Sequence, residues 1–417
     1  MDVKLNLGPE EYSPALVKKI VRQGGRDSFP EAREELREHE GLEIHPARVQ
    51  EITERVGKEW VDQREREVSL FVKNELPRLH GRAPVAAAVM VDGGKLQVRA
   101  DDQPPGVHNP EWREPKYACF LTLDTPESKE DPQPEPPSKF VDREKAPKLA
   151  REIQNRGGIP ACRKPGSEKG AGDKPRQKKQ KRVKKKKVRK YGQLVRTVVA
   201  SMKCAKEFGY MVATEVYLRS LDLARRKGYI CDGLPYNWAI FEDHFRGLGF
   251  VPILDFLHLL SYLYAAAQAA VGGDGARWER YERWLRQAWG GRRDKLLAEI
   301  MVEAERAGPA PKDAAENDPR RVLEDTQRYV ANNMERMDYP RYRKLGLPIS
   351  SAPMESVVKQ FNRRMKGTEK FWTIDGAEAV LQVRAAYLSQ DDRAERYWNM
   401  PRPNYRAVGR NRLALTG

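Results

Sequence analysis

The sequence predicts an α/β protein with a β-sheet of mixed strand direction, an all-helical N-terminal region, and a helical insertion before the last helix. Three observations carry this prediction. Residues 10–80 show apolar residues at helical spacing, strand-like apolar runs lie between residues 85 and 256, and a long helical pattern follows from about 257 to 343. At 417 residues the chain exceeds the usual size of one domain, so we expect two or three.

The N-terminal region, residues 1–82, consists of short helical patterns separated by Gly and Pro. Within it, "GLEIHPARVQEITERVG" has the form of a turn followed by a second helix. This pattern fits a helix-turn-helix element that enters a DNA major groove, and it fits a plain helical bundle equally well.

A change of pattern at residue 85 indicates the first strands. "PVAAAVMVDGGKLQVRA" is a continuous apolar run, then Asp-Gly-Gly, then an alternating segment, which predicts a buried strand with a hairpin partner. "PKYACFLTLDT" predicts a third strand. A Pro- and acid-rich loop follows it and opens an irregular, basic insert at about 125–192.

Residues 193–228 show a helical period that ends at a glycine suited to a C-cap. The order strand, helix, strand then follows in "YICDG", "LPYNWAIFEDHFRGLG" and "FVPILDF". The first part of the core is therefore expected to span residues 83–256, with a helical insertion at 257–345 and the rest of the core at 346–417. Three tryptophans in the insertion are expected to form a helix-packing face: Trp278, Trp284 and Trp289.

The basic charge of the chain is concentrated in one run. Residues 174–190 contain 12 basic residues and no acid, so they supply most of the formal net charge of +17. Such a run repels itself and is expected to be solvated until it meets a polyanion. DNA is the expected partner, and the Lys184, Lys185, Lys186 and Lys187 block is expected to contact it; a solubilising linker or a nuclear-import signal are the alternatives.

The four cysteines show no C-x-x-C spacing, which argues against a zinc ribbon or a disulfide scaffold. No secretory signal opens the chain, and no apolar run is long enough to cross a membrane. We therefore expect a cytoplasmic protein associated with the nucleoid and no membrane partner.

Three acids occupy comparable places in the predicted elements. Asp92 ends the first strand, Asp232 ends the strand "YICDG", and Glu355 opens the last helix. The helix dipole alone explains an acid at the position of Glu355. Three converging carboxylates, however, would repel each other unless divalent cations lay between them, and oxygen ligands suit two Mg²⁺ or Mn²⁺ ions.

Four segments resemble, in order, the blocks of bacterial insertion-sequence transposases of the ISKra type, which are distant relatives of the Mutator group: "VMVDGGKLQVR", "CDGLPYNW", "PILDFLHLLSYLYAAA" and "GLPISSAPMESVVKQFNRRMKGTEKFW". The resemblance covers roughly residues 85–400. It implies an RNase H-like catalytic domain with a helical insertion and a DDE metal site, whose acids map to Asp92, Asp232 and Glu355.

The resemblance also implies supporting residues. Asp255 and His258 in "LDFLH" resemble the C/D-x-x-H signature of Mutator-like enzymes, and we expect them to support the site; Asp255 as the metal ligand in place of Asp232 is the alternative. Near Glu355, four basic residues are expected to meet DNA phosphates: Lys359, Arg363, Arg364 and Lys366. Trp372 is expected either to stack on an unpaired base or to be an ordinary core residue.

Together these expectations describe a DDE transposase that binds element ends and catalyses Mg²⁺-dependent DNA cleavage and strand transfer. Because two ends must be held together, the resemblance implies a homodimer or larger assembly on DNA. An RNase H-like nuclease or resolvase without joining activity is one alternative. A domesticated, non-catalytic DNA-binding protein is the other.

Overall fold

The computed structural model describes residues 12–79, 83–99, 111–154, 192–367 and 370–400. The chain forms two compact units. The first comprises residues 1–124, 193–252 and 351–417, and the second comprises residues 125–192 and 253–350. The predicted run 174–190 and its block Lys184–Lys187 lie outside the described residues, so the predicted DNA contacts there stay predictions.

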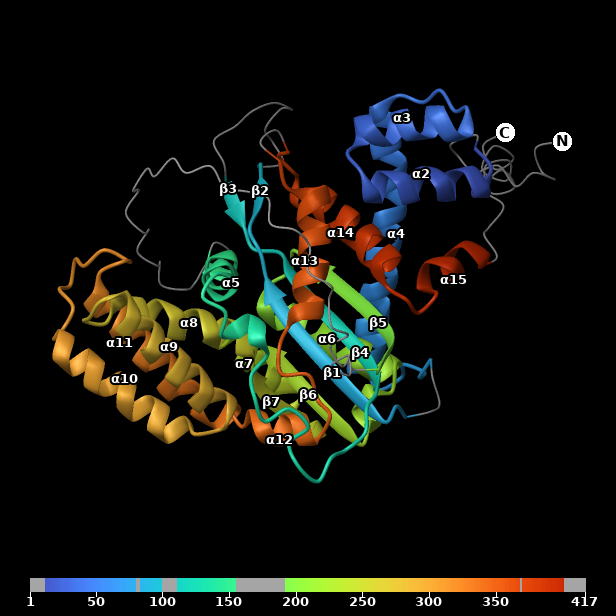
Figure 1. The fold of residues 1–417 in the computed structure, drawn as a ribbon. Coiled ribbons are helices and arrows are strands. Elements are labelled where there is room, and N and C mark those ends of the chain that lie inside the picture. The colour runs from blue at the N-terminus through green and yellow to red at the C-terminus, as the bar shows by residue number, and fades with distance from the viewer. Residues whose placement is uncertain (1–11, 80–82, 100–110, 155–191, 368–369, 401–417) are drawn as a thin grey trace, which may run out of the picture. The chain divides into compact units, whose positions relative to one another are not determined.

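The first unit contains four strands of a five-stranded mixed sheet with the order β5-β4-β1-β6-β7, and it also contains the first two residues of β7 (Figure 1). The strands of this sheet are β1 (Ala86–Gly93), β4 (Lys116–Asp124), β5 (Gly192–Ser201), β6 (Arg226–Cys231) and β7 (Val251–Leu254). Strand β1 pairs antiparallel with β4 and parallel with β6. The continuous apolar run of β1 fits this central place, because a central strand covered on both faces needs apolar residues at successive positions. The predicted α/β class with a mixed sheet is thus confirmed.

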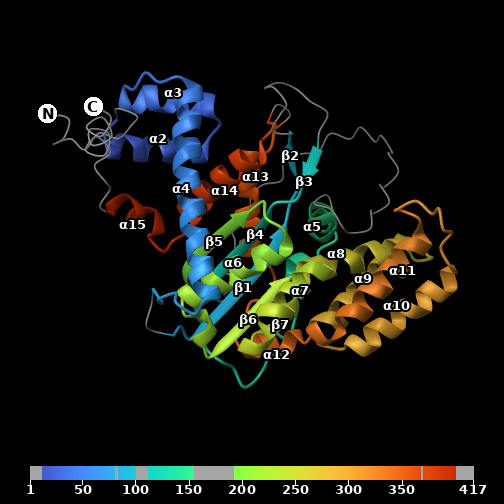
Figure 2. The same cartoon turned by 180° about the vertical axis from the view of Figure 1, so that it is seen from behind.

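Helices cover both faces of this sheet. Helix α13 (Ala352–Met365) crosses the face seen in Figure 1 and packs against β1 and β4. Helix α6 (Ala205–Leu218) packs against β4 from the other side (Figure 2), and α7 (Pro235–His244) packs against α6. The last helix of the sequence prediction, which carries Glu355, therefore lies on the central strands.

The second segment of the expected hairpin does not pair with β1. Strand β2 (Leu96–Val98) instead forms a separate two-stranded ribbon with β3 (Glu111–Arg113), and β1 pairs with β4 along its whole length. The prediction of a β1 hairpin partner was wrong because hairpin signals report only local turn chemistry. The long apolar segment of β4 offers β1 a better-matched neighbour.

The prediction of a helix over residues 193–228 was also wrong at its start. Residues 192–201 form the edge strand β5, and α6 begins only at Ala205. A short apolar run such as "LVRTVVAS" fits a strand and a buried helix equally by periodicity. Its β-branched residues and the open edge of β4 favour the strand.

Helices α2 (Pro14–Arg26), α3 (Phe29–Glu40) and α4 (Pro46–Val72) share a core with α14 (Ile374–Leu388). On α4, Val49, Ile52, Val56 and Trp60 recur at three- and four-residue spacing and are buried. A Cβ on Gly57 would lie 2.4 Å from the carbonyl oxygen of Ala379, so only glycine permits the close approach of α4 to α14. The N-terminal helices therefore belong to the same compact unit as the sheet.

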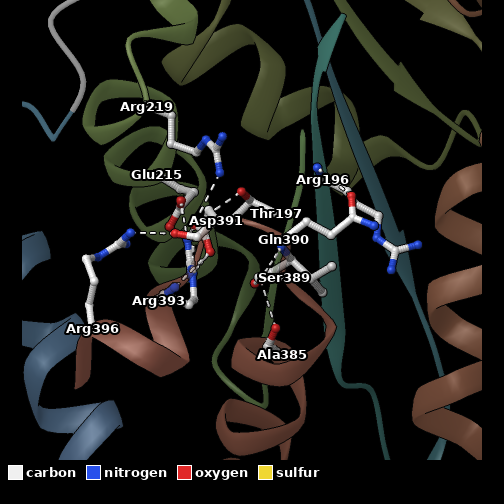
Figure 3. Close-up of polar contacts among 11 residues, drawn as sticks. Arg196, Thr197, Glu215, Arg219, Ala385, Ser389, Gln390, Asp391, Arg393 and Arg396 are labelled. Carbon is white, nitrogen blue, oxygen red and sulfur yellow. Dashed lines mark hydrogen bonds and ion pairs between the residues drawn. The ribbon is translucent and has the colours of Figure 1, made fainter. Parts of the chain in front are cut away.

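A buried ion cluster joins the C-terminal helix α15 (Arg393–Asn399) to α6 (Figure 3). The guanidinium of Arg393 donates to Asp391 at 2.7 Å and to Glu215 at 2.6 Å, and Arg219 donates to Asp391 at 3.1 Å. Burial by itself raises the pKa of Asp391, but the neighbouring arginines outweigh it and lower the pKa to about 2. Asp391 is thus held ionised by its partners.

The second unit is mostly helical. Its helices are α5 (Lys145–Gln154), α8 (Phe256–Ala269), α9 (Asp274–Trp289), α10 (Arg293–Ala307), α11 (Pro319–Asn333) and α12 (Tyr339–Lys344). The tryptophans of α9 are all buried, and the Phe256 ring meets Trp289 and Tyr339 edge-on at 4.9 Å. The helical pattern predicted for residues 257–343 is present and consists of α8 and the four α-helices that follow it.

Candidate active site

Two of the three predicted acids lie at the ends of neighbouring parallel strands. In the pairing of β1 with β6, Met90 is opposite Ile230. Asp92 lies two residues after Met90, and Asp232 lies two residues after Ile230. The two aspartates are therefore at the same position along the two strands, just beyond the last paired residues. Both side chains are half-buried. In α/β sheets, the carboxyl ends of parallel strands are where ligands bind.

Local hydrogen bonds orient both carboxylates. The Gly93 amide donates to Asp92 Oδ1 at 2.8 Å. Asp232 Oδ1 accepts from the Leu234 amide at 3.1 Å and from Asn237 Nδ2 at 2.9 Å. The backbone of the turn after β6 and a side chain in the first turn of α7 thus orient Asp232. An Asp side chain commonly accepts such a hydrogen bond from the backbone two residues later.

Sequence reasoning missed a polar group beside these aspartates. The Tyr236 hydroxyl donates to Glu114 Oε1 at 2.8 Å, and Lys116 Nζ lies 3.9 Å from Glu114 Oε2. Burial, followed by the charges of Asp232, Glu114 and Asp92, raises the pKa of Tyr236, so its hydroxyl stays protonated. Tyr236 stands in the quoted block "CDGLPYNW", which is the signal that could have found it. No comparable signal marks Glu114.

Gly93 is the contact point between this polar group and β1. A Cβ at that position would lie 2.3 Å from Glu114 Oε1 and 2.7 Å from the Tyr236 hydroxyl oxygen. Any side chain would therefore displace the hydrogen-bonded pair. The glycine in "VDGG" serves this close approach rather than the turn of a β1 hairpin.

Glu355 lies in the first turn of α13 and is half-buried. Its helix packs on the sheet through Phe361, whose ring centroid is 4.8 Å from that of Tyr117, the residue opposite Asp92 in β4. Burial and then the Asp92 charge raise the pKa of Tyr117. Across the described part of the chain, however, no three His, Cys, Asp or Glu side chains are grouped closely enough to hold one metal ion. The structure thus aligns the two aspartates without closing a three-carboxylate cluster.

Asp255 and His258 contact each other within the second unit. Asp255 Oδ1 accepts from the Leu257 amide at 2.9 Å and so caps α8, while Oδ2 lies 2.7 Å from His258 Nδ1. The Asp255 side chain is fully buried. Both oxygens therefore have partners in a capping arrangement, and the roles predicted for this pair in catalysis or metal binding stay predictions.

Three of the predicted DNA-binding residues on α13 and at its C-terminal end are exposed. Lys359 and Arg363 recur at a spacing of four residues, which puts them on one side of the helix together with Glu355, and Lys366 follows as the C-cap residue. We call these three exposed residues the cationic stripe, and their predicted contact with DNA stays a prediction.

Arg364 is instead a packing residue, which corrects its predicted contact with DNA, and Trp372 follows the core alternative of the two that the sequence left open. Arg364 is 1% exposed, donates from Nε to the Gly24 carbonyl at 2.9 Å, and lies 4.5 Å from the Phe29 ring centroid. Burial lowers its pKa to about 10. Trp372 is buried beside it and donates from Nε1 to the Met365 carbonyl at 2.9 Å. The N-terminal helices cover this part of α13, which the local sequence does not reveal.

In comparisons with known proteins, no family model and no curated protein matched the chain. Among the helices of the described residues, none combines the length and the apolar character needed to cross a membrane.

Proposed function

We propose that this protein is a DDE-type DNA transposase that cleaves and joins DNA strands with divalent metal ions. The observation that carries the proposal is the placement of Asp92 and Asp232 at the same level on the neighbouring parallel strands β1 and β6. The sheet order β5-β4-β1-β6-β7, with α13 on the central strands, supports an RNase H-like core.

The residues present fit a divalent cation in part. Two half-buried carboxylates at one level repel each other, and a hard cation between them removes that repulsion. Near them, the buried Asn237 Oδ1 accepts no hydrogen bond from the described residues. This oxygen could accept a hydrogen bond from a water molecule bound to the metal. Asp92 and Asp232 would hold the ion, and Glu355 is the third ligand that the sequence resemblance implies. When bound, Mg²⁺ or Mn²⁺ supplies activation of the attacking oxygen and stabilisation of the leaving oxygen.

The protein's own groups prepare this site. The Gly93 amide and Asn237 orient the carboxylates of the two aspartates through hydrogen bonds. The protonated Tyr236 holds the Glu114 carboxylate through its hydrogen bond. Lys359, Arg363 and Lys366 bind phosphates of the strand, which positions the bond to be cleaved next to the acids.

The test is a search for terminal inverted repeats in the DNA that flanks the gene, followed by a cleavage and joining assay on the repeats found. Asp92→Asn and Asp232→Asn should each abolish cleavage and leave DNA binding intact. Asp243→Asn, an exposed acid on α7, is the matched control and should stay active. Cleavage without joining would instead identify a nuclease or resolvase. Binding without cleavage by the unmodified protein would identify a non-catalytic DNA-binding protein.

A further inference from the structure

The β2–β3 ribbon carries an exposed tryptophan that the proposed active site does not use. Trp112 on β3 is 53% exposed, whereas each other tryptophan of the chain is buried or half-buried. It lies opposite Gln97 in the register, on the side of the ribbon away from the buried Leu96 and Val98. The backbone pairing of the ribbon holds this large aromatic ring in solvent. The ring gains the free energy of apolar burial only when a binding partner covers it.

The ribbon is fixed to the end of α13. Val98 forms a parallel bridge with Trp372. The Arg99 amide donates to the Trp372 carbonyl at 2.9 Å, and the Trp372 amide donates to the Gln97 carbonyl at 3.3 Å. The Trp372 side chain in turn donates a hydrogen bond to the carbonyl of Met365 in the last turn of α13. The ribbon therefore has a defined position relative to the cationic stripe of that helix.

Charge continues from the stripe to the ribbon. Lys95, immediately before β2, is exposed. Burial lowers the pKa of Lys366, and the nearby positive charge of Lys95 lowers it further. Among the described residues, neither ammonium group has a carboxylate within ion-pairing distance. Two like charges held together without a counter-charge favour binding of an anion that neutralises both.

We propose that Trp112 stacks on an unpaired base of a DNA strand whose phosphates follow Lys359, Arg363, Lys366 and Lys95. The proposal rests on the proposed function and specifies its substrate: a DNA end with frayed or single-stranded nucleotides. Aromatic side chains beside a cationic track bind single strands in this way, because every base offers a face for stacking. The role that the sequence suggested for the buried Trp372 thus falls to Trp112, on the ribbon attached to it.

The experiment measures fluorescence anisotropy of the full-length protein with two probes, a short labelled oligothymidylate and a duplex of the same length. Trp112→Ala should weaken binding of the single strand about tenfold and change duplex binding less than about twofold. Trp112→Phe should retain most of the single-strand affinity, because the ring is kept. Leu194→Ala, which removes an exposed apolar side chain from β5, is the control and should behave as the unmodified protein.

The salt dependence of DNA affinity distinguishes the contribution of charge from that of base stacking. Lys95→Ala should flatten the dependence of affinity on salt, whereas Trp112→Ala should leave the slope unchanged. Equal single-strand binding by Trp112→Ala and the unmodified protein would overturn the stacking role and leave the proposed function standing. Absence of DNA binding by the unmodified protein would overturn both. A change in sedimentation of Trp112→Ala with no change in DNA affinity would show that the ring contacts a second copy, which also overturns the proposal.

Discussion

Replacing Asp391 with asparagine should destabilise the first unit by removing the charge at the centre of its buried ion cluster. The Asp391 carboxylate accepts hydrogen bonds from Arg393 at 2.7 Å and Arg219 at 3.1 Å, and its side chain is only 4% exposed (Figure 3). Asparagine keeps the size of the side chain. It removes the carboxylate that faces Arg219 and leaves Arg393 with Glu215 alone, so the desolvation of these guanidinium groups is offset less.

The pKa of Asp391 sets the magnitude. It falls from an ordinary value of 3.8 to about 2 in the folded protein, despite burial, because of Arg393 and Arg219. At about 1.4 kcal/mol for each tenfold change, this difference corresponds to about 2 kcal/mol of folding free energy. Because the folded pKa is the lower one, this contribution is fully present above about pH 4 and is lost as the pH falls through about 2.

The measurement is urea unfolding followed by far-ultraviolet circular dichroism at neutral pH and at stepwise lower pH. Asp391→Asn should be less stable than the unmodified protein by about 2 kcal/mol near pH 7. The difference should shrink as both proteins approach pH 2. Asp392→Asn is the matched control, because Asp392 is the exposed neighbour in a left-handed conformation that asparagine also adopts.

Two results would refute this reasoning. If Asp391→Asn unfolds at the same urea concentration as the unmodified protein near neutral pH, the ion cluster contributes no net stability. If the two proteins differ by the same amount at every pH, the effect comes from packing rather than from the charge of Asp391, because an uncharged contact does not depend on protonation.

Three further predictions concern Glu355, the two adjacent arginines of α13 and the basic run 174–190. Glu355→Gln should retain binding of element ends and lose cleavage in a gel-based assay; a helix-capping role worth only about 0.3–1 kcal/mol would instead leave the variant active. Arg364→Ala should lower the free energy of unfolding by about 2 kcal/mol, because it removes a buried hydrogen bond and ring contacts. Arg363→Ala should change stability by less than about 0.5 kcal/mol and weaken DNA binding, because its side chain is exposed. The opposite pattern in thermal unfolding and gel-shift assays would reverse the two assignments. Neutralising the run 174–190 should flatten the salt dependence of DNA affinity, by about 0.9 in the log–log slope for each DNA phosphate that the run binds, and an unchanged slope would mark the run as a linker.

Much of the first unit could be predicted because its signals are local. The continuous apolar run of β1 predicts a central strand, and the acids Asp92 and Asp232 stand at strand ends that can be recognised from the sequence. The arginine-rich, tryptophan-containing helix α9 likewise has a periodicity that is visible without a structure. Each of these features depends on residues that are neighbours in the chain.

The features that sequence reasoning missed depend on contacts between distant segments. The helix prediction for β5 was wrong because pairing with β4, on the far side of a long insert in the chain, is what selects the strand. Tyr236 and Glu114 form their hydrogen bond although 122 positions separate them. No periodicity within either segment records such a meeting.

The sequence by itself determined the α/β class, the positions of the candidate acids and the concentration of basic charge, because composition and short-range spacing encode them. Only the tertiary structure decided which basic and aromatic residues face solvent. Arg364 and Arg363 are adjacent in the chain, yet one is buried against Phe29 and the other is exposed. Trp372 is buried and Trp112 exposed for the same reason: burial depends on which distant elements cover a side chain, and that is fixed only when the chain packs.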